Sequence, residues 1–279
     1  MNSIGSEIKP SLRVGNRLLP FGAHTWVMAV INLSPESRNL HTIAPTTAGA
    51  LTMARRYREM GAAIIDLGGQ SSHFQGPTIP DELEIARLLP TIEALAKEDF
   101  VISVDTWKPE VARAALAAGA QIVNDTGGLA DPEMRKVVAE WGIPVVAVYV
   151  EGANPHAVVA LDTGGAKARR TAGVFADRLA LLGAEGIDQV IIDPGIALNY
   201  PSDYQAYTRL QLEVIRESAA LHELGRPVLI PIPRKKEDHR VMAYITLALE
   251  YGADLIRVHD VEAACDLVEL FGRTGPGLA

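Results

Sequence analysis

Short apolar runs rich in valine and isoleucine alternate along the chain with polar segments of helical length. The runs are WVMAVIN (26–32), AAIIDLGG (62–69), VISVDT (101–106), QIVNDTGG (121–128), PVVAVYV (144–150), QVIIDPG (189–195), PVLIPIP (227–233) and ADLIRVHD (253–260). Apolar runs of this kind are typical of buried parallel strands, and the segments between them are long enough for crossover helices. The pattern therefore predicts eight strand and helix units.

The segments between the runs carry the start and stop signals of helices. A threonine begins TTAGALTMARRYREMG (46–61) and a glycine closes it, while Pro109 and the pair Asp131 and Pro132 mark two further helix starts. Later segments, including a long one from about 202 to 224, have similar helical patterns. We expect each helix to return the chain to a new strand.

Eight such units in about 250 residues predict an α/β fold that is a single (β/α)8 TIM barrel. We place the barrel at about 24–272, in one domain that spans 1–279, because no linker or low-complexity stretch divides the chain. A doubly wound open sheet is the alternative, since a sequence does not show whether a sheet closes. In both architectures the ligand lies beyond the C-terminal ends of the strands.

The composition restricts the partners that the chain can have. The 279 residues are 48% hydrophobic, and the formal net charge of −8 argues against nucleic acid or an anionic membrane as the main partner. The single cysteine, Cys265, excludes an internal disulfide and leaves no thiol-rich metal site. No segment has the length and apolar character of a signal peptide or a membrane span, so we expect a soluble cytoplasmic protein.

Polar residues gather where the predicted strands end. They are Asn32, Asp66, Asp105, Asn124, Asp125, Glu151, Asp193, Lys235, Arg257, His259 and Asp260. In a barrel these ends face a shared pocket, so we expect ligand contacts there. Carboxylates accept hydrogen bonds from N–H groups and a carboxamide both donates and accepts, so such a set can hold the amino-pyrimidinone edge of a flat heterocycle.

Several of these residues also have a purely structural explanation. Asp105 and Asp125 are placed to cap the helices that follow them. Asp66 can accept hydrogen bonds from nearby backbone N–H groups, and this structural role explains it at least as well as a ligand contact does. The sequence leaves both interpretations open for each residue.

Positive residues at the last two strand ends predict an anion site. The segment Arg234–Lys236 follows the seventh run, and Arg257 and His259 lie in the eighth. A solvated basic turn is the alternative for the segment, and it is the interpretation that we favour for Lys236. Arg257 and His259 alternate with apolar Ile256 and Val258, so both point to the same side of a buried strand, which we expect to be the inward side. Adjacent strands seven and eight of such barrels are a recurrent site for phosphate.

Five segments resemble, in order and spacing, the signature segments of the dihydropteroate synthase family of pterin-binding barrels. They are VMAVINLSPES, IIDLGGQSS, ISVDTWKPEVARAALAAGAQIVNDTGG, VIIDPGI and LIRVHDV. The resemblance extends from about Trp26 to Phe271. It implies a transferase that joins 6-hydroxymethyl-dihydropterin diphosphate to p-aminobenzoate, with a pterin or folate as the substrate, Mg²⁺ at the diphosphate and a homodimeric assembly.

The resemblance also assigns roles to particular residues. It implies that the pterin ring is held by Asp105, Asn124, Asp193, Lys235 and Arg257. It implies a diphosphate site at Asn32, Ser72, His73, Arg257 and His259, in which Asn32 is the metal position. On this basis the catalytic residues are Lys235, Arg257 and His259.

The chain departs from the family pattern in the loops around the second-substrate pocket. Ser72 and His73 stand where the family usually has Thr-Arg, and Ala197–Tyr200 replaces Gly-Phe-Gly-Lys. Pro233–Glu237 replaces Ser-Arg-Lys-Ser-Phe, and Arg38 stands where an aromatic residue is expected. These departures predict an altered acceptor site.

Two other functions are compatible with the same residues. Methyl-tetrahydrofolate-dependent methyltransferases hold their ligand with a similar Asp, Asn and Asp set, but Lys235, Arg257 and His259 argue against this function because a methyl donor has no diphosphate. A paralogue that binds a pterin without condensing it is the other alternative, since the pocket residues are intact and the loops differ.

Overall fold

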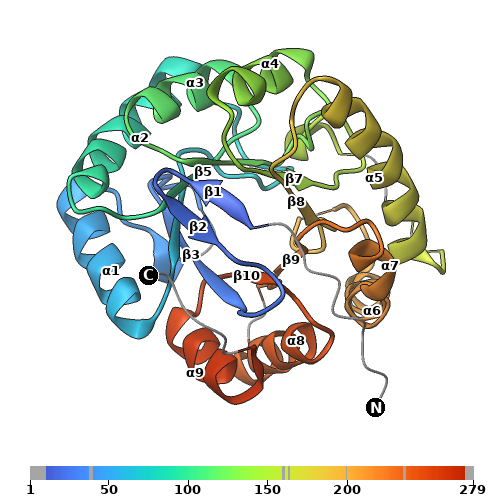
Figure 1. Ribbon diagram of the computed structural model, residues 1–279. Helices are drawn as coiled ribbons and strands as arrows, with labels where there is room; N and C mark the ends of the chain where they lie inside the picture. The colour runs from blue at the N-terminus through green and yellow to red at the C-terminus, as the bar shows by residue number, and fades with distance from the viewer. Residues whose placement is uncertain are drawn as a thin grey trace.

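Eight parallel strands form a barrel at the centre of the molecule (Figure 1). The computed structural model describes residues 11–37, 40–158, 161–162, 164–198, 200–234 and 237–273. The barrel strands are β3 (Trp26–Asn32), β4 (Ile64–Gly68), β5 (Ile102–Asp105), β6 (Ile122–Asp125), β7 (Val145–Val148), β8 (Val190–Asp193), β9 (Leu229–Pro231) and β10 (Leu255–Val258). All eight predicted runs therefore contain a strand.

The sheet closes on itself. Its hydrogen-bonded order is β8-β7-β6-β5-β4-β3-β10-β9, and every neighbouring pair is parallel. The two ends of this order meet in a parallel bridge between Ile192 and Val228, where the N–H of Ile192 donates to the carbonyl of Pro227 at 2.9 Å. The structure confirms the (β/α)8 barrel and excludes the open doubly wound sheet.

A ring of helices surrounds the barrel (Figure 1). The helices are α1 (Thr47–Met60), α2 (Asp81–Ala96), α3 (Pro109–Ala117), α4 (Pro132–Trp141), α5 (Lys167–Ala184), α6 (Tyr204–Arg216), α7 (Ala219–His222), α8 (Asp238–Glu250) and α9 (Val261–Phe271). Thr46 caps α1 by accepting from the N–H of Gly49, and Asp131 caps α4, as predicted. No helix of the described segments is long and apolar enough to cross a membrane.

The predicted long helix at 202–224 is two helices, α6 and α7. Between them the buried Ser218 donates its hydroxyl hydrogen bond to the carbonyl of Tyr251, outside its own helix. The chain turns at this point, and the shorter α7 carries it back towards β9. A helical pattern alone does not reveal such a break, because the side-chain contact that holds it is distant in sequence.

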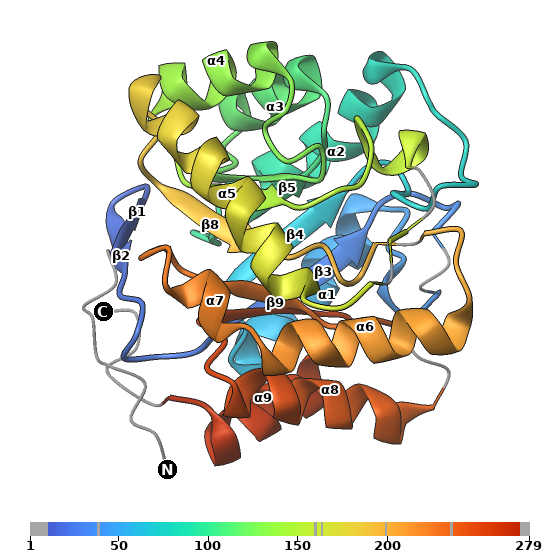
Figure 2. The same cartoon turned by 90° about the vertical axis from the view of Figure 1, so that its right-hand side faces the viewer.

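A β-hairpin that the sequence reading did not predict covers one end of the barrel (Figures 1 and 2). It consists of β1 (Leu12–Val14) and β2 (Arg17–Leu19), which pair antiparallel. The N–H of Arg13 donates to Oε1 of Gln189, the residue directly before β8, at 2.7 Å. The hairpin therefore lies at the amino-terminal ends of the strands, opposite the predicted ligand end.

The core has two apolar clusters separated by the barrel wall. The larger one, which includes Ile65 and Ile256, fills the space between the strands and the helices. The smaller one lies inside the barrel, where Met28 and Ile64 pack against the hairpin residue Leu19. Apolar side chains of the hairpin thus help to fill the barrel interior at the amino-terminal ends of the strands. The polar side chains of the interior lie at the carboxyl-terminal ends.

Candidate active site

Arg257 joins two carboxylates at the carboxyl ends of the strands. On β10, its Nε donates to Oδ2 of Asp66 at 2.6 Å, and its Nη2 donates to Oδ2 of Asp105 at 2.7 Å. Nδ2 of Asn124 donates to the same Asp66 oxygen at 3.1 Å. Four strands therefore bring these side chains into one network, which includes three of the residues predicted to hold a pterin.

The strand periodicity explains why these side chains point inward. Ile256 and Val258 flank Arg257, and Ile65 and Leu67 flank Asp66; all four apolar residues belong to the outer cluster against the helices. Successive strand residues point to opposite faces, so the residues between them face the barrel interior. The predicted inward direction of Arg257 is confirmed.

Asp66 has a different role from the structural one considered for it. It accepts hydrogen bonds from the side chains of Arg257 and Asn124, and both bonds go to Oδ2. The expected bonds from nearby backbone N–H groups are not among its contacts in the described residues. The alternation of Ile65, Asp66 and Leu67 was a sequence signal for an inward carboxylate.

Asp193 lies in the same group of charges, at the end of β8. Its Oδ1 accepts from the N–H of Gly195 at 2.6 Å, and the charges of Arg257, Asp105 and Asp66 all act on its carboxyl. Gly195 has φ +70°, and a Cβ at this position would overlap the carbonyl oxygen of Tyr149. Only glycine fits this turn, which places the N–H group against Asp193.

Burial makes the carboxyl groups of Asp105 and Asp193 harder to ionise than ordinary aspartates. Burial raises the pKa of Asp105 to about 7 against the opposing charge of Arg257, and burial likewise raises the pKa of Asp193 to about 7. Burial lowers the pKa of Arg257, but the negative charges of Asp66 and Asp105 outweigh the effect of burial. The net result is a raised pKa for Arg257, so its guanidinium stays charged. A ligand with several N–H donors satisfies this acceptor-rich group best.

A second cluster joins three segments beside Arg257. Nδ2 of Asn32 donates to Oγ1 of Thr42 at 2.7 Å, and the same hydroxyl lies 3.3 Å from Nδ1 of His259. Burial, together with the charges of Arg257 and Arg234, lowers the pKa of His259 to about 3, so its imidazole is neutral at pH 7. The structure thus brings Asn32 and His259 together.

Thr42 is a site residue that the sequence reading missed. It is fully buried in the short 3-10 helix η1 (Leu40–Thr42). It contacts Asn32 at the end of β3 and His259 directly after β10. A threonine in a polar loop carries no pattern that distinguishes it from its neighbours, so no sequence signal was available.

Other strand-end residues have structural partners. Asp125 accepts from the N–H groups of Gly127 and Leu129 in the loop after β6, so its partners are local and structural. The following helix α4 is capped by Asp131, so the helix-capping explanation is wrong for Asp125. Glu151 forms an ion pair with the buried Lys167. Asp260 caps α9. Asp105, in contrast, binds Arg257, and the capping explanation is wrong for it as well.

The contacts of the described residues do not connect His73 of the predicted diphosphate site to Arg257. His73 accepts from the N–H of Gln75 at Nδ1, at 3.1 Å, and its own N–H donates to Ser71, so these contacts stay within the β4–α2 loop that also carries Ser72. Lys235 and Lys236 lie outside the described residues. Within the described part of the chain, no three His, Cys, Asp or Glu side chains form a group that can hold a metal ion.

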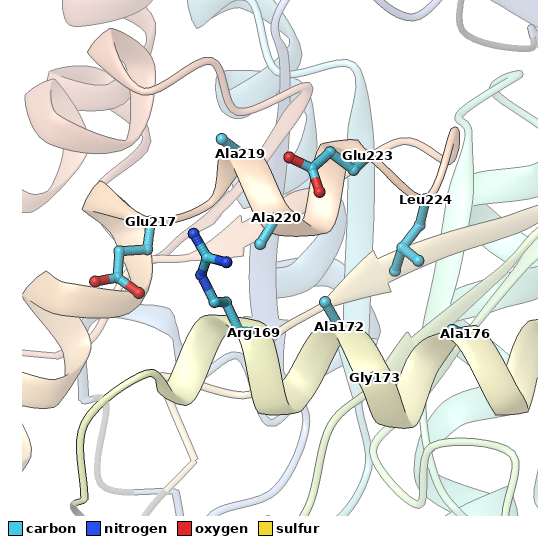
Figure 3. Close-up of a pocket in the computed structure, with 9 residues that line it drawn as sticks. All are labelled: Arg169, Ala172, Gly173, Ala176, Glu217, Ala219, Ala220, Glu223 and Leu224. Atoms are coloured by element: carbon cyan, nitrogen blue, oxygen red, sulfur yellow. The ribbon is translucent and has the colours of Figure 1, made fainter.

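A cavity of about 620 Å³ lies away from the strand ends, between α5 and the α6–α7 segment on the outer surface (Figure 3). Its lining consists of Arg169, Ala172, Gly173, Ala176, Glu217, Ala219, Ala220, Glu223 and Leu224. None of the predicted site residues lines this cavity. Because enzymes of this fold place their sites at the C-terminal ends of the strands, we do not assign the active site to it.

Sequence comparisons agree with this geometry. A family model described as pterin binding enzyme matches residues 28–259. The dihydropteroate synthase of Synechocystis sp. is 31% identical, and the alignment covers 97% of this chain and 97% of that protein. The dihydropteroate synthase of Escherichia coli is 29% identical, with coverage of 90% of this chain and 92% of that protein.

Solved structures give the same result. The Xanthomonas albilineans dihydropteroate synthase with 4-aminobenzoic acid has a TM-score of 0.79 and 31% identity, and the match covers 94% of this chain and 97% of that one. The Burkholderia cenocepacia dihydropteroate synthase complexed with 7,8-dihydropteroate has a TM-score of 0.77 and 26% identity, covering 95% and 96%. The chain therefore belongs to the pterin-binding enzyme family and is a transferase that resembles dihydropteroate synthase.

Proposed function

We propose that the chain condenses a pterin diphosphate with an aromatic amine such as p-aminobenzoate. The observation that carries this proposal is the buried group of Asp105, Asn124, Asp193 and Arg257 at the strand ends, in a chain similar to dihydropteroate synthases over nearly its whole length. The acceptor oxygens of this group match the N–H donors of a 2-amino-pyrimidinone edge.

The chemistry requires one bond to form and one to break. The amine nitrogen attacks the methylene carbon of the pterin, the bond from that carbon to the diphosphate oxygen breaks, and the amine loses a proton. In our proposal Asp105, Asn124 and Asp193 hold the ring, and Arg257 flanks it. The carboxylates stabilise positive charge that develops on the ring as the diphosphate leaves.

We place the diphosphate between Arg257 and the cluster of Asn32 and His259. The neutral imidazole of His259 carries one N–H donor, and the charge for the anion comes from Arg257, Arg234 and Lys235 of the sequence. Lys235 has a proposed catalytic role here on the basis of its position in the sequence. Ser72 and His73 supply at most neutral donors, so they bind the anion less strongly than an Arg does.

Mg²⁺ fits this site only as an ion carried by the substrate phosphates. Asn32 is the proposed metal ligand through Oδ1, because its Nδ2 already donates to Thr42. Mg²⁺ commonly keeps several waters and binds through few protein oxygens together with phosphates, so one amide oxygen is compatible with it. When bound, the ion neutralises charge on the leaving diphosphate.

The acceptor side of the pocket is the part that we propose to be altered. The loop after β8 is fixed to α6, because Tyr207 and Gln211 both donate to the carbonyl of Ile196, at 3.0 and 2.7 Å. Tyr200 is buried, and its hydroxyl accepts from the N–H of Glu151 at 3.1 Å. These contacts support a rigid acceptor wall where the family usually has Gly-Phe-Gly-Lys.

We also propose a homodimer. Large apolar side chains are exposed on the last two helices, with Leu270 70% and Phe271 48% exposed on α9 and Met242 43% exposed on α8. A second copy can cover such a surface. Sedimentation of the wild type and of Phe271→Asp should give a dimer and a monomer respectively.

The condensation is tested by incubating the protein with 6-hydroxymethyl-dihydropterin diphosphate, Mg²⁺ and p-aminobenzoate. We expect amine-dependent release of diphosphate and its loss in Asp193→Ala. Binding of the pterin without release would instead identify a non-condensing paralogue. Tight binding of methyl-tetrahydrofolate with loss of its methyl group would identify a methyltransferase.

A further inference from the structure

Asp66 is a buried carboxylate to which the proposed function gives no direct ligand contact. It is fully buried on β4, and its Oδ2 accepts from both Arg257 Nε and Asn124 Nδ2. Because Arg257 holds this oxygen at 2.6 Å, the carboxylate is fixed in place before any ligand arrives.

The bond from Asn124 fixes which way its amide faces. A carboxylate has no N–H group, so the amide must direct Nδ2, and not Oδ1, towards Asp66. Oδ1 of Asn124 consequently faces away from Asp66. This oxygen is buried, and among the described residues it has no hydrogen-bond partner.

We propose that Asp66 is a positioning residue that orients the Asn124 amide so that its oxygen accepts a hydrogen bond from an N–H group of the pterin ring. This inference rests on the proposed function. A buried acceptor without a partner costs free energy, and a ring N–H that binds there removes that cost. If the amide were turned over, it would present N–H groups to the ring donors, and the pairing would be lost.

The test compares the affinities of four proteins for 6-hydroxymethyl-7,8-dihydropterin, a ligand without diphosphate. We expect Asp66→Ala to weaken binding about tenfold or more, because Asn124 loses its orienting acceptor. Asp66→Asn should stay within about threefold of the wild type, since an amide oxygen in the place of Oδ2 accepts the same two bonds.

A double-mutant cycle separates this role from a general structural one. If Asp66 acts through Asn124, the double variant Asp66→Ala/Asn124→Ala should bind no more weakly than Asn124→Ala alone. The inference would be overturned if the double variant lost affinity by the product of the two single-variant losses. An equal loss of affinity in Asp66→Ala and Asp66→Asn would overturn it as well. Should Asp66→Ala not fold, Asp66→Ser, which keeps an oxygen but not its reach, takes its place in the cycle.

A measurement without ligand keeps the two proposals distinguishable. In ¹⁵N-labelled protein the side-chain amide signals of Asn124, identified by their absence in Asn124→Asp, should show slow hydrogen exchange in the wild type and in Asp66→Asn. Exchange should be at least tenfold faster in Asp66→Ala. Failure of the wild type to bind the pterin would refute the proposed function, whereas equal exchange in all three proteins would refute the role of Asp66.

Discussion

Asp105 and Asp193 are buried carboxyl groups of the candidate site, and their ionised forms destabilise the protein when no ligand is bound. Burial raises the pKa of each carboxyl to about 7, well above the ordinary value near 3.8. The folded protein therefore binds more protons than the unfolded chain between about pH 4 and 7, and its stability falls as the pH rises through this range. These residues are retained at a cost in stability that a ligand can offset.

Asp193→Asn should make the protein more stable at pH 8. The amide keeps an oxygen for the N–H of Gly195 but carries no charge to bury, and we expect a gain of about 2 to 4 kcal/mol in the free energy of unfolding. At pH 4 the gain should fall below about 1 kcal/mol, because the carboxyl is then protonated in the folded protein and partly protonated in the unfolded chain. Denaturant unfolding at the two pH values measures the difference.

Asp188→Asn is the matched control, because Asp188 is exposed and the substitution removes the same charge. It should change stability by less than about 0.5 kcal/mol at both pH values. Identical behaviour of the two variants would contradict the buried-charge account.

Pterin affinity should increase with pH through about 7. Ring N–H groups donate to ionised carboxylates, so binding favours the deprotonated forms of Asp105 and Asp193. Below pH 6 we expect a loss of up to about tenfold per pH unit for each proton that must leave. Calorimetry in buffers of different ionisation enthalpy detects the released protons, and a pH-independent affinity without proton release would be incompatible with this assignment.

The loop after β8 and the hairpin β1–β2 lie at opposite ends of the barrel. The loop is tied to the segment after β7 and to α6 through Tyr200, Tyr207 and Gln211. The hairpin is tied to the barrel by apolar packing and by Arg13. One element faces the proposed acceptor and the other stabilises the opposite end, so changes in them should have separable effects.

Tyr200→Phe should raise the KM for the aromatic amine while leaving pterin affinity unchanged. The substitution removes the hydroxyl that accepts from the N–H of Glu151 and loosens the loop beside the amine, and a threefold to tenfold effect, roughly 1 kcal/mol, is expected. Tyr204→Phe, on the exposed start of α6, is the control. Steady-state kinetics with each substrate varied separately distinguish the two KM values, and an equal effect on both would argue against an acceptor-side role.

Leu19→Ala should destabilise the protein by about 2 to 5 kcal/mol without changing pterin affinity. Leu19 is fully buried in the barrel interior, whereas its neighbour Leu18 is 55% exposed. Leu18→Ala is therefore a control with the same chemical change, and it should have little effect on the unfolding midpoint. Equal midpoints for the two variants would show that the hairpin is not part of the core.

The sequence was sufficient to predict the elements that have long-range periodicity. Each apolar run became a strand, and Thr46 and Asp131 cap their helices as expected, because these signals are local. The three-residue strands of the hairpin are too short to give a periodic pattern, and their partners lie in distant strands. The break before α7 depends on a bond from Ser218 to a residue far along the chain.

The same distinction applies to the site. Arg257 and the strand-end Asp and Asn residues could be predicted because alternation shows which way each side chain points. The pairing of Arg257 with Asp66, and the link from Asn32 to His259 through Thr42, could not be predicted. These contacts depend on how strands that are far apart in the sequence meet around a closed barrel.

At the scale of the whole molecule, the barrel separates stability from chemistry. The hairpin lies at the amino-terminal end of the barrel (Figure 2), where apolar side chains fill the interior. The charged network of Arg257, Asp66 and Asp105 occupies the carboxyl-terminal end. In our proposal, this division lets the loops at the carboxyl-terminal end differ from the family pattern while the residues that hold the ring stay the same. It is the basis for proposing a conserved pterin pocket with a changed acceptor side.

A crystal structure of the protein with bound 6-hydroxymethyl-7,8-dihydropterin tests the central claim most directly. We predict the ring at the carboxyl ends of the strands, with its N–H groups within about 3 Å of oxygens of Asp105, Asn124 and Asp193. A ring bound elsewhere, for example between α5 and α7, with those three residues left without contact to it, would contradict the account.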